Sequence, residues 1–360
     1  MNFIEVSEKL YADLGGSRDF SAYREKLSAA IAVGDIGDLY PRYAALKVCD
    51  ICNSNCAYCG HASGSAMPKK PSPSFEKICD VLSQMSEIGV AATTISGGEP
   101  LLRDDIADIV AHSVRKKVVP ILLTNGLTLG GKLDELYRAG LRFIIISIDT
   151  LDSEAYKLTR GVPVDGILRS LGALFRFKEA HADLHVHITS VLSRASEDGI
   201  EPLIDFFSAR GISAQINPFH NFLEFDKDRL VAADFPKTVQ LCDRLIAKKR
   251  EGARIVSSDA FLGHCPDFLY GKRMLPEGFS CSAGYTNIYI DVSLNVNPCW
   301  DFYNPPVGNL YEHRLSDLWF GADYGRVRRD MQKNKCRGCW LLCTAECTIA
   351  FEDAKGDGNT

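Results

Sequence analysis

Four cysteines lie close together in the stretch VCDICNSNCAYCGH at residues 48–61, namely Cys49, Cys52, Cys56 and Cys59. Cysteines at such short spacing are typical ligands of a metal ion or an iron–sulfur cluster. All four would form two CxxC pairs with only three residues between them, whereas a zinc ribbon needs a longer gap. Without Cys49, the remaining CxxxCxxC offers three thiolates to a [4Fe–4S] cube and leaves the fourth iron for a non-protein ligand.

The second group of cysteines lies near the other end of the chain, which has 13 cysteines in total. This group consists of Cys265, Cys281, Cys299, Cys336, Cys339, Cys343 and Cys347. Cys79 and Cys242 stand apart in helix-like segments with apolar neighbours, so we interpret them as core residues. Disulfides are rare in a reducing compartment, and the second group therefore predicts a second metal or cluster site.

Composition narrows the class of protein. The chain has 360 residues, of which 46% are hydrophobic and 24% charged, with a net charge of −5. These values are typical of a soluble globular protein with one large domain or two ordinary ones. The acidic balance argues against a nucleic-acid partner. No apolar run reaches the roughly 18 residues of a membrane span, and the N-terminus lacks the order of a signal peptide. We therefore expect a cytoplasmic protein with no membrane partner.

Short apolar segments bounded by turn residues alternate with helical patterns along the chain. The predicted strands are 43–48, 91–96, 118–123, 141–147, 184–192 and 212–218. The predicted helices are 74–88, 105–116, 132–139, 165–180, 200–210 and 236–251. Successive strand–helix units predict an α/β fold with a parallel sheet and right-handed crossovers. Eight units close a TIM barrel, so six predict an open, partial (β/α)6 TIM-like barrel, with an open doubly wound sheet as the alternative.

Polar and glycine-rich motifs follow the predicted strands. The cysteine cluster follows the first strand, SGGEP (96–100) the second, TNG (124–126) the third, SID (147–149) the fourth and NPFHN (217–221) the sixth. In such folds the chemistry gathers at the carboxyl ends of the strands. These motifs therefore predict one site at one rim of the barrel.

CxxxCxxC after the first strand, with the aromatic Tyr58 before its last cysteine, resembles the signature of the radical S-adenosylmethionine (radical SAM) superfamily. The other motifs appear in the right order, and the resemblance covers roughly residues 43–225. It implies that Cys52, Cys56 and Cys59 hold a [4Fe–4S] cluster whose open iron binds S-adenosylmethionine. An electron from a donor such as flavodoxin or ferredoxin would then cleave this molecule to a 5′-deoxyadenosyl radical, which takes a hydrogen atom from the substrate. Cys49 is then a bystander at the strand end, with an accessory ligand as the alternative.

The resemblance also implies contacts to S-adenosylmethionine. Gly97 and Gly98 would let the backbone approach its methionine part, and Glu99 would accept a hydrogen bond from its ammonium group. Ser147 and Asp149 resemble the pair that meets its ribose or carboxylate.

Several further residues are candidates with open alternatives. Arg160, in the sequence TRG, resembles a carboxylate clamp, and a solvated surface arginine is the alternative. Further candidates for cofactor contacts are Tyr58, Asn125 and Asn217. His220 and Asn221 are weaker candidates for substrate contacts, and a structural role is as good an interpretation of His220.

The segment after residue 286 predicts a β-hairpin with its turn near Val292-Ser293, then a short strand, an amphipathic helix and the terminal cysteines. This order resembles the SPASM and twitch extensions of radical SAM enzymes, which hold auxiliary Fe–S clusters. The chain has Leu294 where the SPASM pattern has glycine, a shorter gap in the terminal cysteine run and no cysteine after Cys347. We therefore expect one auxiliary [4Fe–4S] cluster rather than two, in an extension that caps the barrel rim.

The expected auxiliary ligands are Cys281, Cys299, Cys336 and Cys339, with Cys343 as an alternative ligand. A second auxiliary cluster would require Cys265, Cys343 and Cys347. A zinc site is the simpler alternative for this region.

The chain is expected to contain an N-terminal helical segment (1–42), a radical SAM partial barrel (43–251) and an auxiliary cluster domain (252–360). Residues 1–42 leave room for about two helices, one near 20–32, and not for a peptide-recognition domain. This favours a small polar substrate, such as a sugar or aminocyclitol intermediate in natural-product biosynthesis.

The auxiliary cluster favours net oxidation of that substrate, a dehydrogenation. One alternative is a peptide-modifying enzyme that acts on ribosomal peptides, and another is an epimerase with Cys265 or Cys347 as hydrogen donor. A non-enzymatic zinc or Fe–S scaffold protein is the alternative from another class, but it leaves Gly97-Gly98-Glu99 unexplained.

Overall fold

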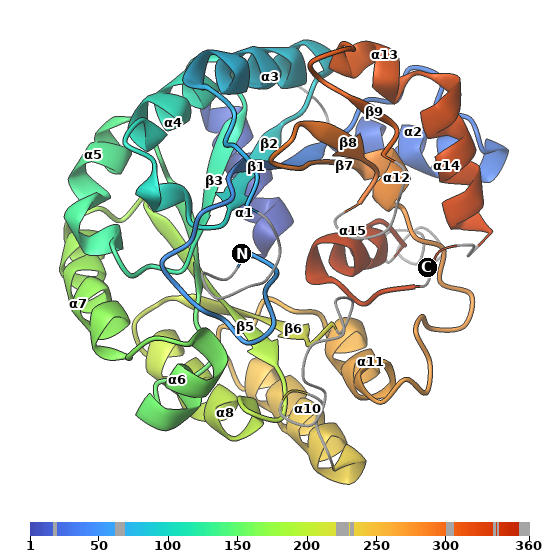
Figure 1. The fold of residues 1–360 in the computed structure, drawn as a ribbon. Coiled ribbons are helices and arrows are strands. Elements are labelled where there is room, and N and C mark those ends of the chain that lie inside the picture. The colour runs from blue at the N-terminus through green and yellow to red at the C-terminus, as the bar shows by residue number, and fades with distance from the viewer. Residues whose placement is uncertain are drawn as a thin grey trace.

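The computed structural model describes residues 1–16, 20–61, 69–220, 230, 234–299, 306–333, 336 and 338–352. Within these ranges, strands β1–β9 form one curved sheet in the order β6-β5-β4-β3-β2-β1-β7-β8-β9 (Figure 1). They are β1 (Tyr43–Cys49), β2 (Ala92–Gly97), β3 (Val119–Thr124), β4 (Phe143–Ser147), β5 (His185–Leu192), β6 (Ser213–Pro218), β7 (Asn287–Ile290), β8 (Asn295–Asn297) and β9 (Gly308–Asn309). Because β1–β6 pair in parallel and in chain order, the predicted partial barrel is confirmed.

Helices cover the outside of the barrel, as Figure 1 shows. They are α3 (Phe75–Ile88), α4 (Ile106–Arg115), α5 (Leu133–Arg138), α7 (Asp165–Ala180), α8 (Glu197–Ser208) and α10 (Phe235–Arg250). Each matches a predicted helix. Short elements were missed at the rim: α6 (Ser153–Arg160), η1 (Pro100–Leu102) and η2 (Leu129–Gly131). Alternate strand residues such as Leu46 and Val48 face the helices and are fully buried there, as expected for a sheet covered by helices.

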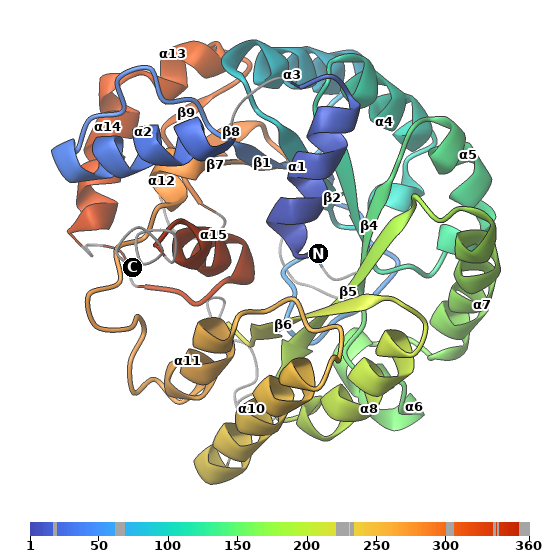
Figure 2. The same cartoon turned by 180° about the vertical axis from the view of Figure 1, so that it is seen from behind.

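The other residues of each strand face the inside of the barrel, which we call the interior face. At the lower end, where the strands begin, α1 (Phe3–Asp13) closes the barrel (Figure 2). Phe3 makes ring contacts with Tyr43 of β1 and Phe143 of β4. The fully buried Arg42 donates from Nε to Glu8 of α1 over 2.8 Å. The second N-terminal helix, α2 (Phe20–Val33), agrees with the helix expected near residues 20–32.

The C-terminal region contains α11 (Asp259–Leu269), α12 (Ala283–Thr286), α13 (Leu315–Trp319), α14 (Ala322–Gln332) and α15 (Leu342–Glu352). The predicted hairpin is present, and Leu294 in its turn has a positive φ of 63°, a conformation that favours glycine. The hairpin was expected to cap the barrel rim, and this was wrong. Instead, β7 pairs in parallel with β1 and extends the barrel wall. The single helix expected before the terminal cysteines is two helices, α13 and α14. In both views α15 lies across the opening between β6 and β7 (Figures 1 and 2).

Candidate functional site

Cys52, Cys56 and Cys59 lie in the loop that follows β1, and we call residues 50–61 the cluster loop. Desolvation raises the pKa of the Cys56 thiol to about 12; Arg160 opposes this effect, whereas Cys59 and Cys52 add to it. Such thiols become thiolates readily only beside a cation, which iron supplies. No group of three His, Cys, Asp or Glu side chains in the described ranges is arranged to hold a single metal ion. A cube binds each thiolate at a different iron, so this donor set fits a [4Fe–4S] cluster.

Gly97 and Gly98, at the end of β2, hold the start of the cluster loop. The Gly98 N–H donates to the Cys49 carbonyl over 2.8 Å, and the Glu99 N–H donates to the Ile51 carbonyl over 2.8 Å. A Cβ at Gly97 would lie 2.2 Å from the Cys49 oxygen, and one at Gly98 would lie 2.0 Å from the Ile51 oxygen. The glycines are therefore required by close backbone contact, besides their predicted role toward S-adenosylmethionine.

Cys49 is fully buried in the core, where its Sγ lies 3.9 Å from the Ile51 carbonyl oxygen. Burial raises its pKa to about 11. Its packing in the core supports its interpretation as a bystander.

Glu99 is fully buried directly behind the cluster loop. Its Oε1 accepts from the Leu101 N–H over 3.0 Å and from Thr124 Oγ1 over 2.7 Å, and its Oε2 accepts from the Asn125 N–H over 2.7 Å. Burial raises the pKa of this carboxyl. None of these three partners is charged, and an ammonium group would stabilise the carboxylate there. The geometry is thus compatible with the predicted contact, which stays a prediction.

Asn125 connects the end of β3 to the cluster loop. Its Nδ2 donates to Asn53 Oδ1 over 2.7 Å and lies 3.8 Å from Cys52 Sγ. Its Oδ1 accepts from the Leu127 N–H over 3.0 Å. Asn125 therefore contacts Cys52, one of the predicted cluster ligands, and its own contact with the cofactor stays a prediction.

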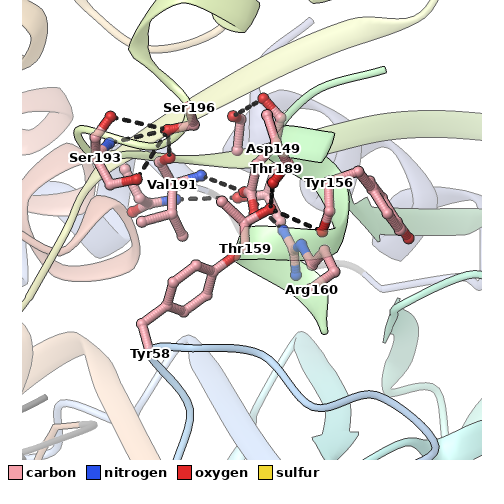
Figure 3. Close-up of polar contacts among 12 residues, drawn as sticks. Tyr58, Asp149, Tyr156, Thr159, Arg160, Thr189, Val191, Ser193 and Ser196 are labelled. Atoms are coloured by element: carbon pink, nitrogen blue, oxygen red, sulfur yellow. Dashed lines mark hydrogen bonds and ion pairs between the residues drawn. The ribbon is translucent and has the colours of Figure 1, made fainter. Parts of the chain in front are cut away.

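Asp149, Arg160 and Tyr58 form one buried network at the rim (Figure 3). Arg160 Nη2 pairs with Asp149 Oδ1 over 2.7 Å, and the Tyr58 hydroxyl donates to Asp149 Oδ2. The Val191 N–H donates to Asp149 Oδ1 over 2.8 Å. Asp149 is 0% and Arg160 5% exposed, so the alternative of a solvated surface arginine is wrong. Arg160 Nε has no hydrogen-bond partner in the described structure, and a carboxylate would satisfy it. Ser147 lies on the interior face, two residues before Asp149.

The end of α6 supports the cluster loop from the other side. The Asn55 N–H donates to the Arg160 carbonyl over 3.1 Å, and the Ala57 N–H donates to the Thr159 carbonyl over 2.9 Å. Gly161 ends the helix with φ of +69°, and a Cβ there would lie 2.1 Å from the Asn55 oxygen. Gly161 was not predicted to support the site, although a glycine after a basic helical turn is a typical helix end.

Asn217 and His220 anchor the C-terminal segment to β6. Asn217 Oδ1 accepts from the Leu342 N–H over 3.0 Å, and its Nδ2 donates to Thr189 Oγ1 over 3.0 Å. His220 Nε2 accepts from the Trp340 N–H over 3.1 Å. Burial lowers the pKa of His220 to about 3, which favours its structural interpretation. The cofactor contact of Asn217 stays a prediction, and Asn221 lies outside the described residues.

Four cysteines from three segments of the chain line one small pocket, which we call the auxiliary pocket. They are Cys281, Cys299, Cys336 and Cys339, beside Leu275, Phe279 and Met331. Desolvation and the nearby Cys339 raise the pKa of Cys281 to about 12. This set equals the expected auxiliary ligands, and four thiolates fit a fully protein-bound cube. The alternative ligand Cys343 is exposed on α15.

Cys265 and Cys347, the candidate hydrogen donors, are buried in apolar packing. Cys265 Sγ lies 3.3 Å from the Phe261 carbonyl oxygen within α11. Cys347 packs in the lower core with Tyr43 and Tyr285. Burial raises the pKa of both thiols. These surroundings lend no support to a role as hydrogen donor.

Comparison with known proteins identifies the family. A model of the radical SAM superfamily matches residues 46–207, and a model of the SPASM iron–sulfur cluster-binding domain matches residues 281–340. The chain therefore contains a radical SAM domain, which is followed by a SPASM domain. It is therefore a radical SAM enzyme whose cofactors are S-adenosylmethionine and [4Fe–4S] clusters, as the sequence predicted.

Curated relatives differ in how much of the chain they match. A GTP 3′,8-cyclase of Limosilactobacillus fermentum is 32% identical over 223 residues, which cover 55% of this chain and 61% of the cyclase. The chain thus spans about three-fifths of the length of that relative. An AdoMet-dependent heme synthase of Methanosarcina barkeri is 26% identical over 345 residues, which cover 88% of this chain and 94% of the synthase.

Solved structures share the fold at low identity. SuiB of Streptococcus suis bound to S-adenosylmethionine has a TM-score of 0.63 at 20% identity, and the matched region covers 80% of this chain and 68% of the SuiB chain. Native anSMEcpe with bound AdoMet has a TM-score of 0.60 at 17% identity, and the matched region covers 79% of this chain and 82% of the anSMEcpe chain. No described helix is long and apolar enough to cross a membrane.

Proposed function

We propose that this radical SAM enzyme oxidises a small polar metabolite by two electrons, such as a sugar-like or aminocyclitol-like alcohol that becomes a ketone. A hydrogen atom leaves the carbon, a second electron follows, and the hydroxyl proton goes to solvent. The S-adenosylmethionine-derived radical supplies the first step, and an auxiliary cluster would accept the second electron. Residues of this chain hold the substrate and exclude water.

The interior face of the upper barrel carries the argument for a small polar substrate. Thr94, Ser147, Thr189 and Asn217 lie on this face, and all four are partly exposed. The outward residues between them, such as Ile188 and Ile216, are fully buried against helices. Solvent therefore reaches an inner surface of hydroxyl and amide groups, which suits a ligand rich in hydroxyl groups.

The auxiliary pocket supports oxidation. Its four cysteines would occupy every iron of a cube, which leaves no iron for direct substrate binding and favours electron transfer. The pocket also lies near the barrel, because Trp340 and Leu342, which follow Cys339, bond to His220 and Asn217 at the end of β6. The packing of Cys265 and Cys347 in apolar cores weighs against epimerisation.

The test is a reaction in D₂O. Reconstituted enzyme, S-adenosylmethionine and a chemical reductant are incubated anaerobically with a metabolite extract, and products are followed by mass spectrometry. We expect a product that lacks two hydrogens, carries no solvent deuterium at carbon and forms with one 5′-deoxyadenosine each. A product with one carbon-bound deuterium and no mass loss would show epimerisation. Turnover with peptides alone would favour the peptide-modifying alternative.

A further inference from the structure

Lys47 is exceptional among the strand residues. In the nine strands that the structure describes, it is the one Asp, Glu, Lys or Arg side chain. β1 lies between β2 and β7 in the sheet, and neither of its edges is free. An ammonium group in such a place is costly unless it has a specific partner.

The side chain of Lys47 points into the barrel. Strand residues alternate between the two faces, and Tyr43, four residues earlier, contacts Phe3 inside the barrel. Lys47 Nζ lies 5.2 Å from the ring centre of Tyr289 on the neighbouring strand β7. Both Lys47 and Ala45 are partly exposed, whereas Leu46 and Val48 on the other face are fully buried. Lys47 is therefore on the solvent-accessible interior face.

A chain of polar contacts holds Lys47 in this position. Its Nζ lies 2.8 Å from His61 Nε2, and His61 Nδ1 contacts Asp50 Oδ1 on the other side of the ring. Asp50 Oδ2 also accepts from the Lys70 N–H over 2.7 Å. The imidazole thus stands between the ammonium group and Asp50. This arrangement orients the lysine beside the cluster loop.

Ser96 provides an independent observation. It lies opposite Lys47 in the β1–β2 register, so both side chains are on the same face. Ser96 is 3% exposed, and its hydroxyl has no hydrogen-bond partner in the part of the chain that the structure describes. Buried hydroxyls are normally paired, so this one indicates a partner that binds there.

We propose that Lys47 and the Ser96 hydroxyl bind an anionic group of the substrate, a carboxylate or a phosphate, inside the barrel. Lysine is a common ligand of both groups because its ammonium donates charge-assisted hydrogen bonds. This inference rests on the proposed small polar substrate and narrows it to an acidic or phosphorylated metabolite. The hydroxyl groups of Thr94, Ser147 and Thr189 would then face the uncharged part of the molecule.

Anion binding is tested on the anaerobic holoenzyme with saturating S-adenosylmethionine. Melting temperature is measured against sodium phosphate and sodium malonate, with sodium chloride at equal ionic strength as reference. We expect a saturable rise with one of the two probes, and the probe that acts identifies the kind of anion. Lys47→Gln, which can still donate to His61, should weaken this response about tenfold or more, and Lys47→Arg should largely keep it. Ser96→Ala should weaken it several-fold, whereas Lys248→Met on the outer helix α10 should match the wild type.

Three results with the purified protein would overturn the proposal, and a fourth would come from the metabolite extract. The first three are no response to either probe beyond chloride, an equal response in Lys47→Gln, or a loss of iron or S-adenosylmethionine affinity in both Lys47→Gln and Lys47→Arg. The last of these three would assign Lys47 to the cofactor site. Failure of the proposed oxidation can be distinguished from failure of the anion site. If the product carries deuterium, the reaction is not an oxidation, but the substrate should still be found in the fractions of the metabolite extract that an anion exchanger retains. A substrate found in the neutral fraction would refute the anion site and leave oxidation intact.

Discussion

Some side chains at the rim would contact the cofactors, and others hold those side chains in position. Cys52, Cys56 and Cys59 lie together in the cluster loop, whereas Cys49 is packed in the core. CxxxCxxC spacing and the family resemblance together predict that the first three are cluster ligands and that Cys49 is not. The pairing of Asp149 with Arg160 was not predictable, because the sequence does not show that α6 ends at Arg160 and turns its side chain inward.

Alanine variants of the cysteines test which of them are cluster ligands. Cys52→Ala, Cys56→Ala and Cys59→Ala should each abolish formation of 5′-deoxyadenosine, because a cube that loses a thiolate is no longer held at all three irons. Cys49→Ala should keep cleavage close to wild type and cost only the packing of one small buried side chain. Cleavage lost in Cys49→Ala with normal iron content would show that Cys49 is a ligand.

The buried ion pair gives a stability prediction. Asp149→Asn leaves the Arg160 guanidinium buried beside a neutral amide, and loss of one partner of such a pair costs about 3–5 kcal/mol. Asp183→Asn removes a surface pair with Arg142 and should cost less than about 1 kcal/mol. Urea unfolding of both variants measures the difference. Equal effects would mean that the Asp149 pair contributes no more than a surface pair.

Among the elements, loops packed backbone to backbone fix the cluster loop. The strands were predictable to within about two residues because apolar runs and turn residues are local signals. The attachment of β7 to β1 was not, since it depends on pairing between residues far apart in the chain. The contact between α6 and the cluster loop was not predictable either, and Gly161 is the one feature of the sequence that indicates it.

Gly161→Ala should therefore damage the site without unfolding the barrel. Its Cβ would lie 2.1 Å from the Asn55 oxygen and would displace the cluster loop. A displacement of about 1 Å lowers rates on the order of 100-fold, so 5′-deoxyadenosine formation should fall by roughly that factor. Gly131→Ala is the matched control, because no atom lies within 4 Å of its added Cβ. Similar rates in both variants would argue against support of the loop by α6.

β5 carries a pH-sensitive histidine inside the lower barrel. Burial, the chain's amino terminus and His185 lower the pKa of His187 to about 3, and its Nδ1 lies 3.2 Å from Gln215 Nε2. Below about pH 6.5 the unfolded chain binds a proton that the folded protein does not, so stability falls by about 1.4 kcal/mol per pH unit. Urea unfolding of the wild type and of His187→Asn is compared between about pH 7 and pH 5. The free energy of unfolding should fall less steeply with decreasing pH in the variant, by up to one bound proton. An unchanged slope in His187→Asn would contradict the assignment of this pH dependence to His187.

At the scale of the whole molecule, two cysteine sites share one curved sheet. The cluster loop follows β1, and the hairpin that leads to Cys299 pairs directly with β1. The order of the motifs predicted both groups of cysteines. The four cysteines of the auxiliary pocket come from three separate parts of the chain, namely Cys281, Cys299 and the pair Cys336 and Cys339. The common sheet was not foreseen, and it makes the SPASM domain part of the barrel wall. Two clusters should therefore form independently on one scaffold.

Iron content and electron paramagnetic resonance of two combined variants test this expectation most directly. In Cys52→Ala/Cys56→Ala/Cys59→Ala, we expect about four irons per chain, the spectrum of one reduced [4Fe–4S] cluster and no cleavage of S-adenosylmethionine. In Cys281→Ala/Cys299→Ala/Cys336→Ala/Cys339→Ala, we expect about four irons and retained cleavage without substrate oxidation. Zinc without iron in the first variant, or cleavage by that variant, would contradict the account.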